Sequence, residues 1–494
     1  MKENRNMQWL LVCIIVAIPI WAHLTELPIQ LWDESRVAIN SFEMYKDHHF
    51  LTTHFNGEPD MWNTKPPFVV WAQFVSYHVF GINEFAVRFP SALAGTLTCL
   101  FLFWFLARKK KNPVLGIISV VILITSYGFV KYHHSPRTGD YDAMLTFFSL
   151  AYIIFFYLFI EEEKSKYLYL AMLCITLTVM VKSVTGLIFV PALFLYTLYK
   201  KKLLLVLKSP ALYLGIIFFI LIVGGYYWIR EQHNPGYWEA VQINDLWGRM
   251  NIKHEDSGRY VPVPFYYYNL IIDSNYRYWY FFLPIGALVG IYHKQDLKDI
   301  TIFCFLLCLV FFLVISSSKT KHDWYDMPMM PLFAVLSGIG VYTLAHLLAN
   351  SVIWQGVLNK NVLPYIFIVL PALPAYAIML VNSTKPDPGE WISYNTHVCK
   401  YLKDMYYSNL KVPDISLVDE NEYQANVDWY AQVLKEKKNA NVAWVKYENI
   451  NPYSKIVVYK DGTMKRIEQD FQYSYVEKIY DDKIRIYQLN GKNN

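Results

Sequence analysis

Charged side chains are scarce in this sequence. Asp, Glu, Lys and Arg make up 17% of its 494 residues, whereas hydrophobic residues make up 55%. Soluble globular chains usually carry about a quarter charged residues. The deficit is concentrated in long uncharged runs, as insertion into a bilayer requires. Because Lys and Arg cluster at the ends of these runs, there is no basic face to bind nucleic acid. We therefore expect an integral membrane protein without a nucleic-acid partner.

The sequence also lacks the short motifs of several common sites. Five of the six cysteines fall in apolar runs, and one cysteine alone in the polar C-terminal part cannot form a disulfide there. No CxxC pair suggests zinc. Neither a GxGxxG fingerprint nor a Walker A loop is present, so a cytosolic nucleotide-sugar site is not indicated. The cysteines are Cys13, Cys99, Cys174, Cys304, Cys308 and Cys399.

What the sequence has instead is a series of apolar runs near the length of about 20 residues that a transmembrane helix needs. Lys2 and Arg5 precede the first run, but no small-residue cleavage site follows it, so we interpret it as an uncleaved membrane helix. The stretch 167–199 is too long for one crossing, and Lys182 and Gly186 interrupt it, so we predict a hairpin there. The predicted spans are 7–26, 88–107, 113–131, 142–160, 167–181, 184–199, 210–229, 278–292, 300–315, 327–349 and 362–381.

Basic loops predict the orientation of these spans. With the N-terminus inside, the cytoplasmic loops contain the basic residues of 108–111, 200–202 and 294–298, and the opposite loops are longer with sparser charges. This asymmetry follows the positive-inside rule. An odd number of crossings then places the chain from about residue 382 outside, at the extracytoplasmic face of an inner (plasma) membrane.

The chain changes character at residues 382–389, which are polar and contain two prolines. We therefore predict a membrane domain over 1–381 and a small soluble α/β domain over 382–494. In the second domain, helical patterns occupy about 390–408 and 424–437. Strand patterns occupy 413–418, 441–446, 454–460, 474–480 and 484–489.

The first outside loop contains the most informative polar residues. Asp33 and Glu34 follow the first span by a few residues, so this carboxylate pair can act as a base, bind a cation or solvate a helix end. Lys65 precedes two prolines, which impose an extended approach and then allow a helix to start. Lys65 would then be presented rigidly at the membrane surface. The alternative interpretation is an ordinary lysine whose side chain snorkels to the headgroups.

Four motifs follow one another in this region, and together they resemble the ArnT/PMT-type glycosyltransferases, namely the aminoarabinose lipid A transferases and protein O-mannosyltransferases. The resemblance is dense over 31–107, thinner to about residue 331, and not apparent in the C-terminal part. The motifs are Asp33-Glu34-x-Arg36, Asn56-Gly57-Glu58-Pro59, Lys65-Pro66-Pro67 and Gly81-x-Asn83-Glu84-x-x-x-Arg88-x-Pro90-Ser91-Ala92.

The resemblance implies a mainly α-helical GT-C fold with about 11–13 transmembrane helices. It also implies inverting transfer of a sugar from a polyprenyl-phosphate carrier at the outer face of the membrane. Asp33 would be the catalytic carboxylate, and Lys65 would contact the carrier phosphate. Arg36 and Glu34 would belong to the same substrate-binding set. A lipid A-like glycolipid, a polysaccharide and a protein hydroxyl all stay open as acceptors.

Three later loops add candidates. In the second outside loop the resemblance points to an acidic residue ahead of a helix, where Asp142 fits and Asp140 is its rival; read alone, Asp142 is as well explained as an N-cap. The adjacent histidines there indicate an interfacial loop. In the loop 230–277, the resemblance implies a phosphate-binding arginine, either Arg249 or Arg259; a solvated polar loop with an interfacial aromatic belt explains them as well. In the last loop, Lys319, Lys321 and Tyr325 resemble a family element near the carrier phosphate and suit a phosphate clamp. The alternative is a lysine pair at the depth of the headgroups.

One departure from the family pattern concerns metal. Lipid A-modifying relatives have an acidic residue immediately before the loop lysine, whereas this chain has Thr64. A metal site is therefore not predicted and no cofactor is required, although a divalent metal stays open. A transporter or flippase of lipid-linked sugars is the alternative function, but it would place ionisable residues near the bilayer midplane.

Overall fold

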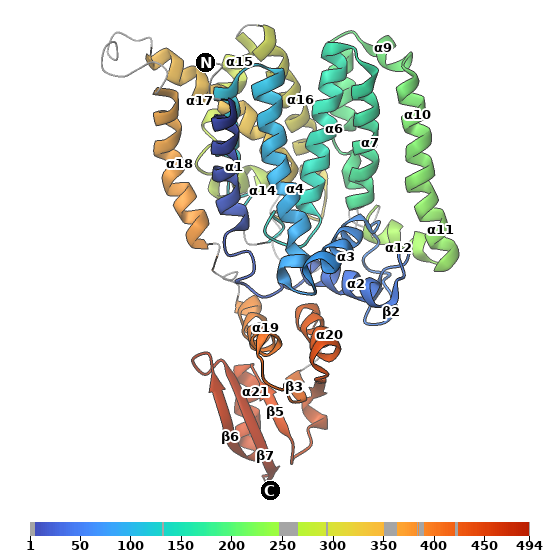
Figure 1. The fold of residues 1–494 in the computed structure, drawn as a ribbon, viewed down its shortest axis with the longest axis vertical. Coiled ribbons are helices and arrows are strands. Elements are labelled where there is room, and N and C mark those ends of the chain that lie inside the picture. Colours follow the sequence, from blue (N-terminus) through green and yellow to red (C-terminus); the bar gives the residue numbers. More distant parts are fainter. Residues whose placement is uncertain are drawn as a thin grey trace.

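The computed structural model describes residues 5–130, 133–246, 265–292, 295–349, 363–382, 384, 390–419 and 423–493. Figure 1 shows a bundle of roughly parallel long helices with a smaller C-terminal region beyond one end of it. The N-terminus lies at the opposite end of the bundle from this region. Short helices and loops, among them those of the first predicted outside loop, fill the space between the bundle and the C-terminal region.

Every predicted span coincides with a helix or a run of helices. This agreement follows from the apolar content of the runs, because a backbone inside a membrane must satisfy its hydrogen bonds internally. The helices are α1 (Arg5–Trp21), α4 (Glu84–Trp104), α5 (Pro113–Ile124), α6 (Asp142–Glu162), α7 (Ser165–Lys182), α8 (Val190–Tyr199), α10 (Pro210–Phe219), α11 (Gly225–His233), α15 (Phe282–Tyr292), α16 (Gln295–Ser317), α17 (Met330–Ala349) and α18 (Leu363–Asn382).

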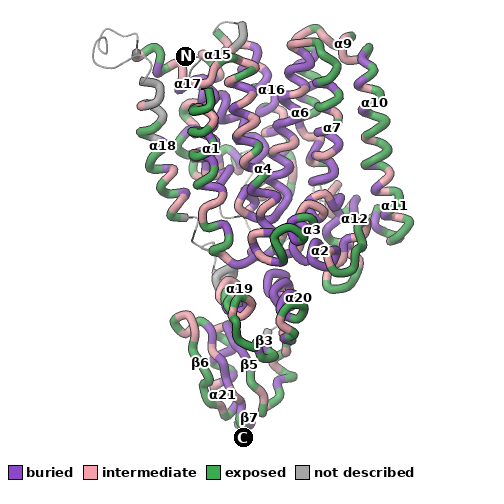
Figure 2. Tube along the Cα trace, viewed as in Figure 1, coloured by how far each residue is buried: buried purple, intermediate pink, exposed green. Residues whose placement is uncertain are grey.

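Within the described ranges, six helical runs have the length and apolar composition to cross a membrane, and several further apolar helices are shorter. The predicted count of crossings therefore stays a prediction, while a multi-pass membrane protein is supported. Burial differs strongly among the runs. The run that contains α10 has only 17% of its most apolar window buried, against 83% for α6, and Figure 2 shows this contrast. Exposed apolar side chains on the run that contains α10, such as Leu221, suit contact with lipid.

The predicted hairpin is present. The side chain of Lys182, at the end of α7, reaches Asp142 at the start of α6, with 2.5 Å between Nζ and Oδ1. The hydroxyl of Tyr196, near the end of α8, donates to Glu161 near the end of α6 at 3.0 Å. The chain thus turns back between α7 and α8, through the 3₁₀ segment Ser183–Leu187. Gly186 is needed there because a Cβ would lie 2.8 Å from the backbone of residues 178 and 179.

Glycines also allow two helices of the bundle to approach closely. A Cβ on Gly286 of α15 would lie 1.8 Å from the carbonyl oxygen of Leu336 on α17, and one on Gly340 would lie 2.8 Å from that of Phe282. Small residues at such crossings are the usual means by which membrane helices pack their backbones together.

The site end of the bundle is built by short elements. They are α2 (Asp33–Asp47), β1 (His54–Phe55), β2 (Glu58–Pro59), α3 (Phe68–Phe80), α12 (Tyr237–Asn244) and α14 (Phe265–Leu270), while α9 (Leu203–Leu207) lies at the other end. Helix α3 begins directly after the second of the two prolines, as the sequence predicted. Most of α2 is buried, including its polar residues Glu34, Ser35, Asn40, Ser41 and Glu43.

The C-terminal region contains a five-stranded sheet of order β4-β3-β5-β7-β6. Strand β3 pairs in parallel with β4 and β5, and β7 pairs antiparallel with β5 and β6. The elements are α19 (Glu390–Tyr407), β3 (Ile415–Asp419), α20 (Ala425–Lys438), β4 (Val442–Lys446), β5 (Lys455–Val458), α21 (Asp461–Asp470), β6 (Phe471–Ile479) and β7 (Ile484–Lys492). All were predicted except α21, which the sequence analysis missed because only three of its residues, Thr463, Met464 and Ile467, are buried.

Glu84, the first residue of α4, joins the two parts of the molecule. Its carboxylate accepts hydrogen bonds of 2.6 Å from the hydroxyls of Tyr430 on α20 and Tyr407 on α19. Nearby, the indole of Trp429 donates to the hydroxyl of Tyr77 on α3 at 3.2 Å. These contacts are buried or half-buried, so the C-terminal region is fixed against the loops that carry the predicted site.

Candidate functional site

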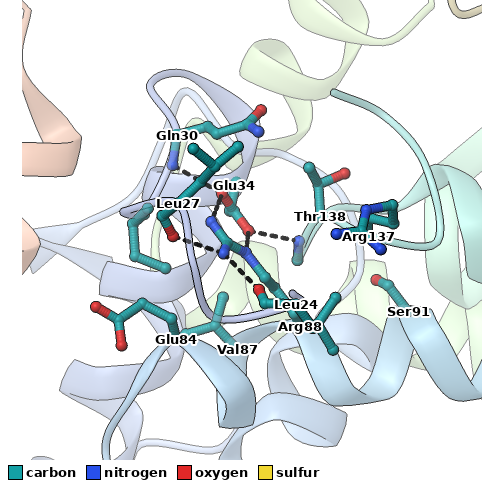
Figure 3. Close-up of polar contacts among 12 residues, drawn as sticks. Leu24, Leu27, Gln30, Glu34, Glu84, Val87, Arg88, Ser91, Arg137 and Thr138 are labelled. Atoms are coloured by element: carbon teal, nitrogen blue, oxygen red, sulfur yellow. Dashed lines mark hydrogen bonds and ion pairs between the residues drawn. The ribbon is translucent and has the colours of Figure 1, made fainter. Parts of the chain in front are cut away.

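Glu34 lies in a buried ion pair with Arg88 of α4 (Figure 3). The guanidinium donates from Nε to Oε1 at 2.7 Å, and the backbone N–H groups of Gln30 and Gly139 donate to the same carboxylate at 2.7 and 2.9 Å. Nη2 of the guanidinium also donates to Oε2 of Glu34 at 3.1 Å. The carbonyl oxygens of Leu24, Leu27 and Pro28 accept further hydrogen bonds from Nη1 and Nη2. Since backbone and arginine donors occupy its carboxylate, Glu34 ties α4 to the loops that contain Gln30 and Gly139. Its predicted role in substrate binding stays a prediction, and its contacts favour a structural role.

Asp33, its neighbour, has a different environment. It is half-buried, and its charge acts on three side chains from separate parts of the chain: Tyr141, Lys182 and Tyr423. Burial first, and then the charge of Asp33, raise the pKa of Tyr141 well above its ordinary value. Asp33 therefore lies where the first loop, the start of α6, the end of α7 and the C-terminal region meet.

Lys65 interacts with Tyr141, one of the side chains on which the charge of Asp33 acts. Its Nζ is 5.0 Å from the centroid of the Tyr141 ring and 4.0 Å from Oδ1 of Asp245, which follows α12. Tyr141 is 2% exposed, and the side chain of Asn63 interacts with its hydroxyl. A buried hydroxyl next to an ammonium group can bind an oxygen of a ligand.

Thr64 precedes Lys65, at the position where the pattern that this chain resembles has an acidic residue. Its hydroxyl donates to Oδ2 of Asp245 at 2.9 Å. A carboxylate is thus present beside Lys65, although it comes from a residue 180 positions later in the sequence rather than from the preceding one. Asp245 could not be predicted as a neighbour of Lys65, because no motif surrounds it in the sequence.

Arg36 is held by Asp60, a second residue that the sequence analysis missed. Two parallel hydrogen bonds join them, Nε to Oδ2 at 2.9 Å and Nη2 to Oδ1 at 2.6 Å. Burial tends to raise the pKa of Asp60, but the hydrogen bonds and charge of Arg36 outweigh it and hold that pKa below its ordinary value. The guanidinium also lies 4.1 Å from the ring centroid of Phe55. Arg36 consequently positions the loop that leads to Lys65.

The predicted alternatives Asp142 and Asp140 lie together with His134 and Lys182. Asp142 is the first residue of α6, and Tyr141 rather than Asp142 occupies the N-cap position. The carboxylate of Asp142 lies 2.5 Å from Lys182 Nζ and 2.7 Å from His134 Nδ1. Asp140 accepts a hydrogen bond from the hydroxyl of Thr138 at 2.6 Å. Burial, opposed by the charge of His134, raises the pKa of Asp140 to about 6. His134 is buried within this ion-pair cluster.

The side-chain atoms of His134, Asp140 and Asp142 lie within 4.8 Å of one another, a spacing that would suit a metal ion. Lys182, however, already supplies a positive charge at Asp142. A divalent cation on the same carboxylate would be repelled by this buried ammonium. These residues therefore fit an internal ion-pair cluster better than a metal centre, and no step below depends on a metal.

The last candidate loop reaches the same cluster through aromatic rings. The ring of Trp324 stacks on that of His134, with centroids 3.8 Å apart and an interplanar angle of 4°, and on that of His322, with centroids 4.4 Å apart. The charge of Lys182 and the phenol of Tyr325 interact. Lys321 donates to the carbonyl of Ser318 within its own loop, and burial lowers its pKa. Lys319 is also in this loop, whereas Arg249 and Arg259 lie outside the described residues.

Part of the chain is similar in sequence to known proteins. Residues 64–228 match the family described as dolichyl-phosphate-mannose-protein mannosyltransferase. A protein of Aquifex aeolicus without a described function is 28% identical over 67% of this chain and 63% of its own length. The undecaprenyl phosphate-alpha-4-amino-4-deoxy-L-arabinose arabinosyl transferase of Aeromonas hydrophila is 26% identical over 63% of this chain. That match spans only 56% of the transferase's own length.

Solved structures share the fold along nearly the whole chain. ArnT from Cupriavidus metallidurans, bound to undecaprenyl phosphate, superposes with a TM-score of 0.66 at 15% identity and covers 98% of both chains. The archaeal oligosaccharyltransferase AglB from Archaeoglobus fulgidus has a TM-score of 0.55 at 12% identity and covers 99% of this chain and 74% of its own. The GT-C fold and the resemblance to ArnT/PMT-type proteins, both predicted from the sequence, are thus confirmed.

Proposed function

We propose that this protein is an inverting glycosyltransferase that moves a sugar from a polyprenyl-phosphate carrier to an acceptor. The observation that carries the proposal is the grouping of Asp33 and Lys65 around Tyr141 at one end of a GT-C bundle. The arrangement offers a candidate acceptor base and a candidate phosphate-binding cation that both interact with one buried tyrosine. The names of the relatives support the carrier class, because they specify an undecaprenyl-phosphate donor.

The chemistry can be assigned to these residues. An acceptor hydroxyl oxygen attacks the anomeric carbon of the sugar, and its proton passes to the carboxylate of Asp33. The bond between the anomeric carbon and the phosphate oxygen breaks, and its electron pair leaves with the polyprenyl phosphate. Lys65, with the hydroxyl of Tyr141, stabilises the negative charge that grows on that phosphate. A single displacement without a glycosyl-enzyme intermediate inverts the anomeric centre.

We further propose that the site lies on the extracytoplasmic side. Lysines gather at the other end of the bundle, where Lys109 pairs with Glu162 at 2.8 Å and Lys200 with Asp299 at 3.0 Å. The positive-inside rule assigns such an end to the cytoplasm. The membrane domain over 1–381 and the soluble domain over 382–494 stay part of this proposal.

Cysteine labelling tests the orientation. In a background without native cysteines, Tyr453→Cys, a position in the C-terminal region that is 72% exposed, should react with an impermeant thiol reagent in spheroplasts. Lys201→Cys, exposed at the opposite end, is the matched control and should react only after lysis. The reverse pattern would contradict the orientation.

The donor class is tested with purified protein in lipid vesicles. Undecaprenyl-phosphate sugars and the corresponding nucleotide sugars are supplied separately, and the released undecaprenyl phosphate and glycosylated product are measured. We expect turnover with the lipid-linked donor only. Turnover with nucleotide sugars alone would contradict the proposal, and movement of intact lipid-linked sugar across the bilayer without cleavage would support a flippase instead. The described charged cluster of Asp142 and Lys182 argues against that alternative, because it lies at helix ends rather than mid-span.

A further inference from the structure

An aromatic group lies immediately beside Asp33 and is assembled from two regions almost 400 residues apart in the sequence. The ring of Trp32 stacks on that of Tyr423, with centroids 5.0 Å apart and an interplanar angle of 26°. Phe55 continues the group, with its ring 6.2 Å from that of Tyr423 at 20°. Trp32 is 41% exposed, although its neighbour Glu34 two residues later is buried. The Trp32 indole thus keeps open surface next to the proposed base.

The group is held in place by the surrounding structure. Trp32 has a φ of 75° and a ψ of −125°, a backbone conformation that non-glycine residues adopt only where their surroundings impose it, often at functional sites. Arg36, fixed by Asp60, lies over the ring of Phe55. Burial raises the pKa of Tyr423 to about 12, and the charges of Arg36 and Asp33 both act on its hydroxyl. The rings are therefore preorganised around the carboxylate.

The position of the group points to the acceptor rather than the donor. Lys65 and Tyr141 approach Asp33 from the first loop and the start of α6, and in the proposed reaction they hold the phosphate of the lipid carrier. Tyr423 approaches from the C-terminal region, which lies beyond the ends of the membrane helices (Figure 1). A molecule that arrives from outside the membrane meets this side of Asp33 first.

An indole face beside a carboxylate matches the chemistry of a sugar ring. One face of a pyranose presents C–H groups that pack on an aromatic ring, and its edge presents hydroxyls that a carboxylate can bind. A tryptophan of an interfacial belt would have lipid headgroups as neighbours. Trp32 instead stacks on a side chain of the C-terminal region, so a belt does not explain its position.

We propose that Trp32 and Tyr423 form the acceptor subsite, that its ligand is a pyranose ring of a glycan or glycolipid, and that the C-terminal region therefore completes the active site. The proposal rests on the proposed transferase function for the role of Asp33. Stacking on Trp32 would direct one hydroxyl of the acceptor ring toward this carboxylate. A protein acceptor, the third class left open by the sequence, would need no such surface.

Equilibrium binding tests the subsite without requiring turnover. Full-length protein in nanodiscs is titrated with cellobiose, maltose and N,N′-diacetylchitobiose as probes, and binding is followed by saturation-transfer NMR. We expect at least one disaccharide to bind the wild type. Trp32→Ala and Tyr423→Ala should each weaken that binding about tenfold, since an aromatic contact of this kind contributes about 1.5 kcal/mol. Trp32→Phe and Tyr423→Phe, which keep a ring, should recover most of it.

Two controls separate the subsite from general damage. Trp228→Ala removes an indole that is 68% exposed on α11 and should leave disaccharide binding unchanged. Binding of undecaprenyl phosphate to Trp32→Ala should also be unchanged, which shows that the donor side is intact. A threonine-containing octapeptide is titrated in parallel and should not bind at Trp32.

The outcomes are distinct from those of the donor experiment. Failure of all three disaccharides to bind, or binding that ignores both alanine variants, would overturn the subsite even if the lipid-linked donor is used. Peptide binding that is lost in Trp32→Ala would overturn it in favour of a protein acceptor. Disaccharide binding that depends on Trp32, combined with no turnover of any lipid-linked donor, would support the subsite and refute the transferase.

Discussion

Asp33 and Glu34 are neighbours in the sequence and have opposite environments in the structure. The carboxylate of Glu34 is 3% exposed and accepts hydrogen bonds from Arg88 and two backbone N–H groups. Asp33 is half-buried, and the charged and phenolic groups that face it come from three other parts of the chain. Successive residues on a helix point about 100° apart, so one faces the interior of the loop assembly and the other the proposed site.

The difference separates a structural carboxylate from a candidate catalytic one. A buried charge that is fully paired contributes to folding, and it is not available to a substrate without losing its partner. A catalytic base must instead reach its substrate and keep its own charge accessible. The first two predictions below use this contrast, and each would fail if the two residues had the same role.

The largest expected effect is on turnover. Asp33→Asn should lower kcat about 10²–10⁴-fold, because it removes the proposed proton acceptor, while thermal unfolding stays unchanged. Turnover of the purified variant with a lipid-linked donor is the measurement. Asp47→Asn, at the exposed far end of the same helix, is the control. Near-normal turnover in Asp33→Asn would leave the carboxylate with a helix-end role only.

Glu34→Ala should act on stability instead. It leaves the guanidinium of Arg88 buried without its carboxylate, which typically costs about 3–5 kcal/mol of folding free energy. We expect a much lower unfolding temperature in detergent and partial recovery in the double variant Glu34→Ala/Arg88→Met, which removes the orphaned charge. If Glu34→Ala unfolds like the wild type but loses donor binding, Glu34 is a substrate ligand, as the sequence analysis first placed it.

Lys65→Ala should give an intermediate effect on the reaction. Loss of a charge-assisted contact to phosphate should lower kcat/KM by about one to two powers of ten. Lys65→Arg should recover part of this, because it keeps the charge but changes the donor geometry. The exposed Lys46→Ala is the control for loss of a cation on the same loop assembly. Equal loss in the Lys46 and Lys65 variants would point to general electrostatic attraction rather than a specific contact.

The smallest expected effect concerns Asp140 and pH. Its pKa of about 6 in the folded protein lies above the ordinary 3.8. Between these values the folded state keeps a proton that the unfolded state has lost, so this residue's contribution makes stability fall as pH rises from about 4 to about 6. Asp140→Asn removes the contribution. The variant should unfold a few degrees higher than the wild type at about pH 7 and show a smaller difference at about pH 4. A difference that grows toward low pH would contradict the raised pKa.

Much of the fold could be predicted from the sequence, because apolar runs specify membrane helices locally. Each predicted span meets a helix, and even the hairpin at Lys182 was predicted from run length. The sheet of the C-terminal region followed from its alternating pattern, but α21 did not, since its apolar positions are few. The domain boundary and the number of membrane crossings stay predictions.

The site was only partly predictable. Asp33 and Lys65 stand in recognisable motifs, although their roles stay predictions, and Glu34 shares a motif with Asp33 despite its different environment. Asp60, Asp245 and Tyr423 could not be found, because each acts on a residue far away in the sequence and carries no local signal. The adjacent histidines His133 and His134 are visible in the sequence, but the pairing of His134 with the carboxylate of Asp142 could be identified only in the folded chain.

By itself the sequence determined the membrane helices, the asymmetry of charge between their two ends, and the family resemblance carried by the first loop. These properties depend on composition and short motifs, which tertiary contacts do not alter. Only the tertiary structure decided which carboxylate is paired, which residue stands beside Lys65 in place of a preceding acid, and that the C-terminal region reaches Asp33. Such facts depend on distances between side chains that are remote along the chain, and those distances exist only once the helices have packed.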